Sequence, residues 1–152
     1  MTSAANFTPQ EWESVLQGPP SAGLIVITAQ RGGTLRETLS MAKAYAEARQ
    51  HHGQSELLDE IVQAKPEIDH TRYGSKDELK ERCLGHLRDT VALLEAKATP
   101  QELEQYRSFV VTLADRVAHA HREGPRDAPQ VGDAEAAAIA AIKDALGADG
   151  SG

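Results

Sequence analysis

Cys83 and His86 are the residue pair whose types and spacing best suit metal binding. They stand three positions apart, so a helix would turn both toward one side, and thiolate and imidazole are common zinc ligands. His121 would complete the set from an antiparallel neighbouring helix, but the expected register places it about 7–8 Å along the axis from Cys83. Zinc bonds of about 2.0–2.3 Å do not span that offset. The simpler interpretation makes Cys83 a small core residue, with metal binding as the alternative.

A short glycine-rich stretch is the second candidate, and it consists of Arg31, Gly32, Gly33 and Thr34. It precedes an expected helix start, where free backbone N–H groups and the helix dipole favour an anion. Arg31 would add a positive charge for a phosphate or carboxylate. The stretch matches neither the P-loop pattern nor the dinucleotide-binding pattern, so an ordinary loop with a Thr cap is the other interpretation.

Two further pairs offer weaker patterns for acid–base or metal chemistry. Glu67 and His70 form one Glu-x-x-His, but di-iron bundles need that pattern twice, and the chain has no second copy. Asp115 and His119 lie four positions apart, beside an apolar stripe, and are expected to face water. Neither the GxSxG nor the HExxH motif occurs. The sequence therefore predicts no enzyme and no cofactor.

Charge and composition exclude several kinds of partner. The chain of 152 residues has 16 Lys and Arg against 23 Asp and Glu, a formal net charge of −7. No stretch forms a basic arm, so a nucleic-acid binder and a polybasic membrane-surface protein are not expected. A partner protein is the expected alternative.

Two further features of the sequence indicate the cellular compartment. Cys83 is the single cysteine, so the chain can form no internal disulfide, which suits a reducing compartment. No basic residue precedes Arg31, unlike a signal peptide, and the apolar run 24–27 is too short to span a bilayer. We expect a cytoplasmic protein.

Capping boxes give the most specific local signal. Four times a Ser or Thr is followed three positions later by Glu, and the pairs are Thr8/Glu11, Thr34/Glu37, Ser75/Glu78 and Thr99/Glu102. In a capping box each side chain binds a backbone N–H group that the helix start leaves free. Phe7 and Trp12 also have the spacing of a hydrophobic staple around the first box. Four helix starts are therefore predicted with some precision.

Glycines are expected to end the helices, at Gly18, Gly53, Gly124 and Gly147. Together the signals predict seven helices, near 9–17, 21–30, 35–51, 55–65, 76–98, 100–122 and 133–146. Segment 21–30 is ambiguous because its β-branched run also resembles a buried strand. No other run could pair with such a strand, so we expect a short buried helix there.

Apolar periodicity supports the two longest helices. One stripe runs along 76–98 and contains Leu79, Cys83, Leu87, Val91 and Leu94. The other runs along 100–122 and contains Leu103, Tyr106, Val110, Leu113 and Val117. A connection of about three residues predicts an antiparallel hairpin between them.

Three stretches carry a resemblance, namely PEIDHTRYGSKDELK, LLEAKATPQELEQYRSFVVTLADRVAHAHREG and VGDAEAAAIAAIKDAL. With FTPQEWESVLQGPPSAGLIVITA near the start, they are similar to a family of small all-helical bacterial proteins of unknown function. The C-terminal end also resembles tellurite-resistance-type helical domains, although the acidic metal-binding pattern of those domains is not evident here. The resemblance implies an all-helical fold and carries over no site residue.

The sequence thus predicts one all-α domain over 1–146, a bundle of six or seven helices around the hairpin, with a disordered tail at 147–152. The expected function is a non-enzymatic interaction or regulatory module in a bacterial cytoplasm, with a stress-related role as one version of it. The last helix would either pack on the body or present an apolar face, containing Ile139 and Ile142, to a partner. Alternatives are a homodimer and a small-ligand protein using Arg31–Thr34 or Cys83 and His86.

Overall fold

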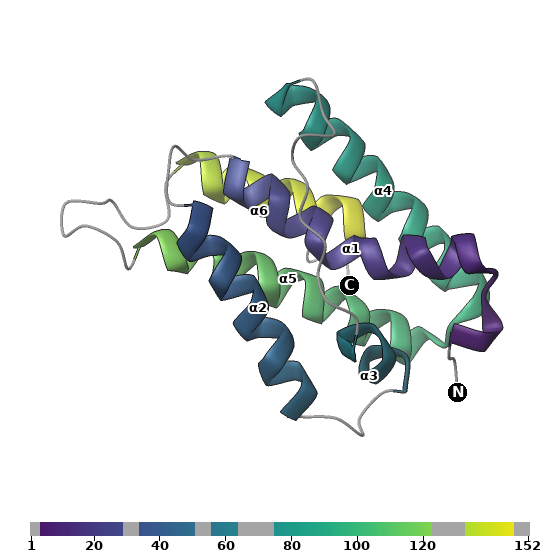
Figure 1. Ribbon diagram of the computed structural model, residues 1–152. Coiled ribbons are helices and arrows are strands. Elements are labelled where there is room, and N and C mark those ends of the chain that lie inside the picture. Colours follow the sequence, from purple (N-terminus) through teal and green to yellow (C-terminus); the bar gives the residue numbers. More distant parts are fainter. Residues whose placement is uncertain (1–3, 29–33, 51–55, 64–74, 123–132, 148–152) are drawn as a thin grey trace.

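The protein folds as an all-α bundle, as its sequence predicts. The computed structural model describes residues 4–28, 34–50, 56–63, 75–122 and 133–147. Within these ranges the chain forms a short 3-10 turn and six α-helices, without a strand (Figure 1). They are η1 (Ala4–Asn6), α1 (Pro9–Thr28), α2 (Thr34–Gln50), α3 (Glu56–Gln63), α4 (Lys76–Lys97), α5 (Pro100–Arg122) and α6 (Asp133–Leu146).

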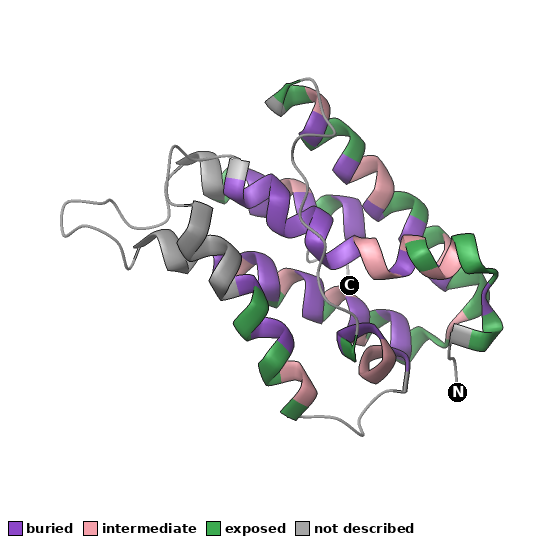
Figure 2. Cartoon of the chain, viewed as in Figure 1, coloured by how far each residue is buried: buried purple, intermediate pink, exposed green. Residues whose placement is uncertain are grey.

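Helix α1 is the centre of the bundle. Its second half, from Gly18 to Ile27, is buried at every position (Figure 2), and α1 contacts α2, α4, α5 and α6. A helix covered on all sides must be apolar around its whole circumference, which explains the β-branched run that resembles a strand. The helical interpretation of 21–30 is confirmed up to Thr28. No helix in the described ranges is long and apolar enough to cross a membrane.

The expected break after Gly18 is wrong, because α1 continues through Gly18, Pro19 and Pro20. A proline inside a helix removes the hydrogen bond to the carbonyl four residues earlier and pushes that carbonyl away. Pro19 thus deprives the carbonyl of Val15. The buried hydroxyl of Tyr106 replaces the lost donor, at 2.8 Å from the Val15 oxygen. Long-range packing therefore compensates for a local helix-breaking signal.

Gly18 serves this close approach rather than a helix end. A Cβ atom at position 18 would lie 1.8 Å from the Tyr106 hydroxyl oxygen, a separation that no two such atoms adopt. Only glycine leaves space for the tyrosine to reach the α1 backbone.

The two long helices keep the predicted stripes, but α1 lies between them. Every residue of both stripes is buried, and α4 and α5 follow each other across the single turn at Ala98 and Thr99. The pair diverges from that turn (Figure 1), and α1 makes far more extensive contacts with each of them than they make with each other. The predicted hairpin is thus a V-shaped frame that holds α1.

Local caps fix the helix ends as predicted. Thr8 and Glu11 form both hydrogen bonds of a capping box, at 2.8 and 3.1 Å, and Thr99 and Glu102 form the same pair. Ser75 accepts the N–H of Glu78 at 3.1 Å. The side chains of Thr34 and Glu37, and the glycines Gly53 and Gly124, lie outside the described residues.

Two further end signals are also confirmed. The rings of Phe7 and Trp12 lie 5.6 Å apart between centroids, which is the predicted staple. Gly147 has a φ of 71° and its N–H binds the Asp144 carbonyl at 3.1 Å, the left-handed cap that favours glycine. The rest of the tail predicted to be disordered lies outside the described residues.

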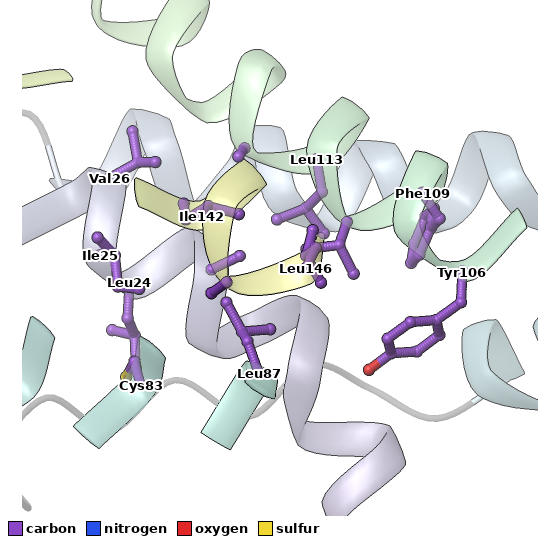
Figure 3. Close-up of a cluster of buried hydrophobic side chains, with 14 of the residues drawn as sticks. Leu24, Ile25, Val26, Cys83, Leu87, Tyr106, Phe109, Leu113, Ile142 and Leu146 are labelled. Atoms are coloured by element: carbon purple, nitrogen blue, oxygen red, sulfur yellow. The ribbon is translucent and has the colours of Figure 1, made fainter. Parts of the chain in front are cut away.

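Helix α6 packs on the body of the bundle. Ile142 is fully buried and Ile139 is 9% exposed, and α6 contacts α1, α4 and α5, with Ile142 in the cluster of buried side chains (Figure 3). The version in which this face binds a partner is therefore wrong, because the bundle itself covers it. Arg107 of α5 donates from Nε to the Leu146 carbonyl at 2.6 Å and so caps the end of α6.

Candidate functional site

The glycine-rich candidate lies mostly outside the described residues. Arg31, Gly32 and Gly33 fall in the undescribed range, and Thr34 is the first residue of α2. Glu67 and His70 are also outside the described ranges. Asp115 is partly buried on α5, whereas the side chain of His119 is not described. The anion-site hypothesis stays a prediction.

Cys83 and His86 lie on α4, but they have different surroundings. Cys83 is 1% exposed within the apolar core (Figure 3). His86 is partly buried, and its Nε2 lies 2.8 Å from the backbone carbonyl of Ser14. Among the described residues, no group of three or more His, Cys, Asp or Glu side chains could hold a metal ion. The structure thus brings no third ligand to this pair, and the metal hypothesis stays a prediction.

The contact of His86 belongs to a polar seam between α1 and α4. The Ser14 carbonyl also lies 3.3 Å from the hydroxyl of Thr90, which is fully buried. A carbonyl oxygen only accepts, so His86 Nε2 donates to it. The Thr90 hydroxyl has one proton, which it shares between the Ser14 carbonyl and the closer His86 carbonyl at 2.8 Å. Pro19 and Pro20 remove the helical donors to the carbonyls of Val15 and Leu16 rather than to that of Ser14, so the contacts of His86 and Thr90 fasten α1 to α4 and do not replace a bond lost at the prolines.

The two helices run antiparallel along this seam, side by side in Figure 1. Ser14 meets residues 86 and 90, while Glu11, further toward the start of α1, binds Lys97 at 2.5 Å near the end of α4. The aromatic ring of Phe7 also lies under the Lys97 ammonium, 5.7 Å from it. This arrangement fixes which side chains of α1 and α4 face one another.

A polar groove of about 500 Å³ follows the outer side of the seam. On α1 it is lined by Gln10, Glu13, Ser14, Gln17 and Ser21. On α4 it is lined by Arg82, Gly85, His86 and Asp89. The residues of each set are spaced so that they share one face of their helix. The groove therefore lies between a polar face of α1 and a polar face of α4, beside the buried apolar faces.

Gly85 has no structural explanation within the described residues. It lies in the interior of α4, where glycine costs roughly 0.8–1 kcal/mol relative to alanine. A Cβ atom built at this position meets no atom within 4 Å, in contrast to Gly18 and Gly23, which both face close neighbours. The fold therefore does not require a glycine here, but the absence of a side chain keeps the α4 backbone open to the groove.

Ser21 is the second unexplained residue of the groove. Its exposed fraction is 7%, yet it lines the groove, and its hydroxyl has no hydrogen-bond partner among the described residues. A buried polar group without a partner costs about 1–3 kcal/mol, so such groups usually have a ligand, a water or a functional role. Ser21 is therefore a candidate contact for a polar group in the groove.

Charges of opposite sign lie at the two ends. Glu13 and Asp89 occupy the same level of the antiparallel pair, next to the Ser14 contacts. Neither carboxylate forms an ion pair within the described part of the chain. Arg82 lies toward the Ser21 end and pairs with Glu78 at 3.8 Å, with 68% of its side chain exposed. Such an exposed pair is weak, and the guanidinium keeps donors for another group.

The serine, histidine and aspartate of the groove do not form a catalytic triad. A triad needs the histidine to accept a proton from a serine hydroxyl and to be held by a carboxylate. His86 Nε2 instead donates to a backbone carbonyl. In the described ranges no hydrogen bond joins His86 to a serine hydroxyl or to Asp89.

A second cavity of about 360 Å³ lies between α2, α3 and α5. Its wall contains Leu58 and Phe109, and the ring of Phe109 packs edge-on against Tyr45. Its charged residues, Glu47 and Arg116, form an ion pair with each other. Because these charges already compensate each other, this cavity has fewer features that need a ligand than the groove between α1 and α4.

Comparisons of this chain with protein-family models, with curated proteins and with solved structures find no match. The family resemblance inferred from the sequence therefore stays a prediction, and the site is interpreted from its own geometry.

Most of the groove residues could not be selected from the sequence. His86 was a candidate, but Glu13, Ser21 and Asp89 are ordinary polar residues on helix surfaces until α1 and α4 are placed together. The one available signal was Gly85, a glycine inside a strong helical pattern that matches no helix end.

Proposed function

We propose that this protein is a non-enzymatic interaction module and that the groove between α1 and α4 is its partner-binding surface. The observation that carries the proposal is Gly85, which lowers the stability of α4, packs against none of the described residues and opens the groove wall. The partnerless buried hydroxyl of Ser21, judged among the described residues, gives independent support. A cytoplasmic location remains part of this proposal.

The apolar faces argue against the other surfaces. The stripes of α4 and α5 and the face of α6 are buried within the bundle, so they offer nothing to a partner. The acidic net charge of −7 also favours a protein or small polar partner over nucleic acid.

Site-specific photo-crosslinking in bacterial cells tests this function. A photoreactive amino acid replaces Gln10, an exposed residue of the groove, and the controls carry it at Lys43 of α2 or Asp144 of α6, which are exposed elsewhere. We expect a discrete protein adduct from position 10, identified by mass spectrometry, and none of comparable yield from the controls. Equal adducts from all three positions, or none from position 10, would contradict the proposal.

A further inference from the structure

We propose that the groove binds an extended peptide segment of the partner protein, with a cation at one end and a carboxylate at the other. A Lys or Arg side chain of the segment lies between Glu13 and Asp89. A carboxylate of the segment lies beside Ser21 and Arg82. This inference rests on the proposed function, because it names the chemistry of the partner that the groove takes.

The cation is assigned from two carboxylates that line the groove at one level. Glu13 comes from α1 and Asp89 from α4, at the level where Ser14 joins His86 and Thr90. Both lack an ion-pair partner in the described residues, so a positive group between them is attracted by both.

The carboxylate is assigned from the donors at the opposite end. The Ser21 hydroxyl is buried and, in the described ranges, has no protein partner, and Arg82 keeps guanidinium donors beside its weak pair with Glu78. An acceptor that carries negative charge satisfies both groups. Ser21 makes this end more than a surface charge, because the residue is only 7% exposed and lines the groove, so a ligand reaches it there.

Spacing indicates an extended peptide. At 1.5 Å per residue, Arg82 and Asp89 are about 10 Å apart along α4, and Glu13 and Ser21 about 12 Å apart along α1. An extended chain covers such a span with about three residue steps of 3.3 Å. Gly85 lies midway on α4 and lets the peptide backbone approach without meeting a Cβ atom.

Amide chemical-shift titrations of the full-length, ¹⁵N-labelled protein test the assignment with three capped tetrapeptides. They are acetyl-Lys-Gly-Gly-Asp-amide, acetyl-Lys-Gly-Gly-Lys-amide and acetyl-Asp-Gly-Gly-Asp-amide. We expect the mixed-charge peptide to bind most tightly and the two-aspartate peptide most weakly, with the largest shifts at amides of residues 10–21 and 82–89. Equal binding of all three, absence of binding, or shifts centred on another surface would overturn the charge assignment.

Charge-removing variants supply the matched comparison. Glu13→Gln and Asp89→Asn should each weaken binding of the mixed-charge peptide by about two- to fivefold, as expected for exposed ion pairs. Ser21→Ala should weaken it as well while leaving the fold intact. Glu81→Gln removes the same charge from an exposed site of α4 outside the groove and should change binding little. If Glu81→Gln has the same effect as Asp89→Asn, the groove assignment is wrong.

The two levels of the proposal fail separately. Adducts from position 10 in cells together with failure of the peptide tests would overturn the peptide chemistry and leave the groove as an interaction surface. Absence of both would overturn the proposed function itself.

Discussion

At the scale of single residues, one hydroxyl supplies a hydrogen bond that the central helix α1 lacks. Tyr106 donates to the Val15 carbonyl, which Pro19 leaves without its usual donor. Burial, together with the neighbouring Tyr45, raises the pKa of Tyr106 well above its ordinary value of 10.0, so the hydroxyl keeps its proton and remains a donor. Gly18 provides the space for this contact.

Tyr106→Phe should therefore lower the free energy of unfolding by about 1–3 kcal/mol, since it leaves a buried carbonyl without a partner. Urea unfolding followed by circular dichroism measures the change. Ser108→Ala, at an exposed position of the same helix, is the control and should stay within about 0.5 kcal/mol of the unmodified protein. A Tyr106→Phe protein as stable as this control would show that the hydrogen bond from Tyr106 to Val15 does not stabilise α1.

At the scale of elements, a charged contact fastens the start of α1 to the end of α4. Glu11 accepts from Lys97 at 2.5 Å and from the Thr8 N–H at 2.8 Å. The hydrogen bond from Lys97 is the main cause that lowers the pKa of Glu11 below its ordinary value of 4.5, and the hydrogen bond from the Thr8 backbone is the second. A lowered folded-state pKa means that the unfolded chain takes up the proton first as the pH falls.

The contribution of Glu11 should thus be complete above pH 4.5 and disappear as the pH falls through the lowered folded-state pKa. Glu11→Gln should reduce the melting temperature at pH 7, and its difference from the unmodified protein should shrink below pH 4.5. Thermal melts from pH 7 to pH 3 measure this difference, with the exposed Glu81→Gln as control. A difference that stays constant across the range would reject the ion-pair account.

Helix ends were predictable from the sequence because their signals are local. Capping boxes such as Thr8/Glu11 and Thr99/Glu102 use residues three positions apart, and the structure contains both. The break after Gly18 was predicted wrongly because its compensation comes from Tyr106, 91 positions after Val15. Groove residues such as Glu13 and Asp89 could not be predicted, because only the packing of α1 on α4 brings them to one groove and no local pattern encodes that packing.

At the scale of the whole molecule, the bundle separates its apolar and polar surfaces clearly. The side chains of α1, α4, α5 and α6 share one core (Figure 3), while the outer edge of the α1–α4 contact forms a groove with two features that the packing of the described residues does not explain. Proteins often retain destabilising residues at functional sites. Gly85 and Ser21 fit that pattern, and Gly85 allows a direct comparison of stability with binding.

The most direct measurement is therefore made on Gly85→Ala and Gly85→Leu, with melting temperature and crosslinking yield from position 10 determined for each variant. Ala92→Leu, at an exposed site of α4 outside the groove, serves as the control for an added side chain. We predict that Gly85→Ala raises the melting temperature, by an amount that corresponds to roughly 0.8–1 kcal/mol. We also predict that both Gly85 variants lose most of the adduct, while Ala92→Leu keeps it. A more stable Gly85→Ala protein together with an unchanged adduct in both variants would contradict the account, because the open backbone at Gly85 would then have no role in binding.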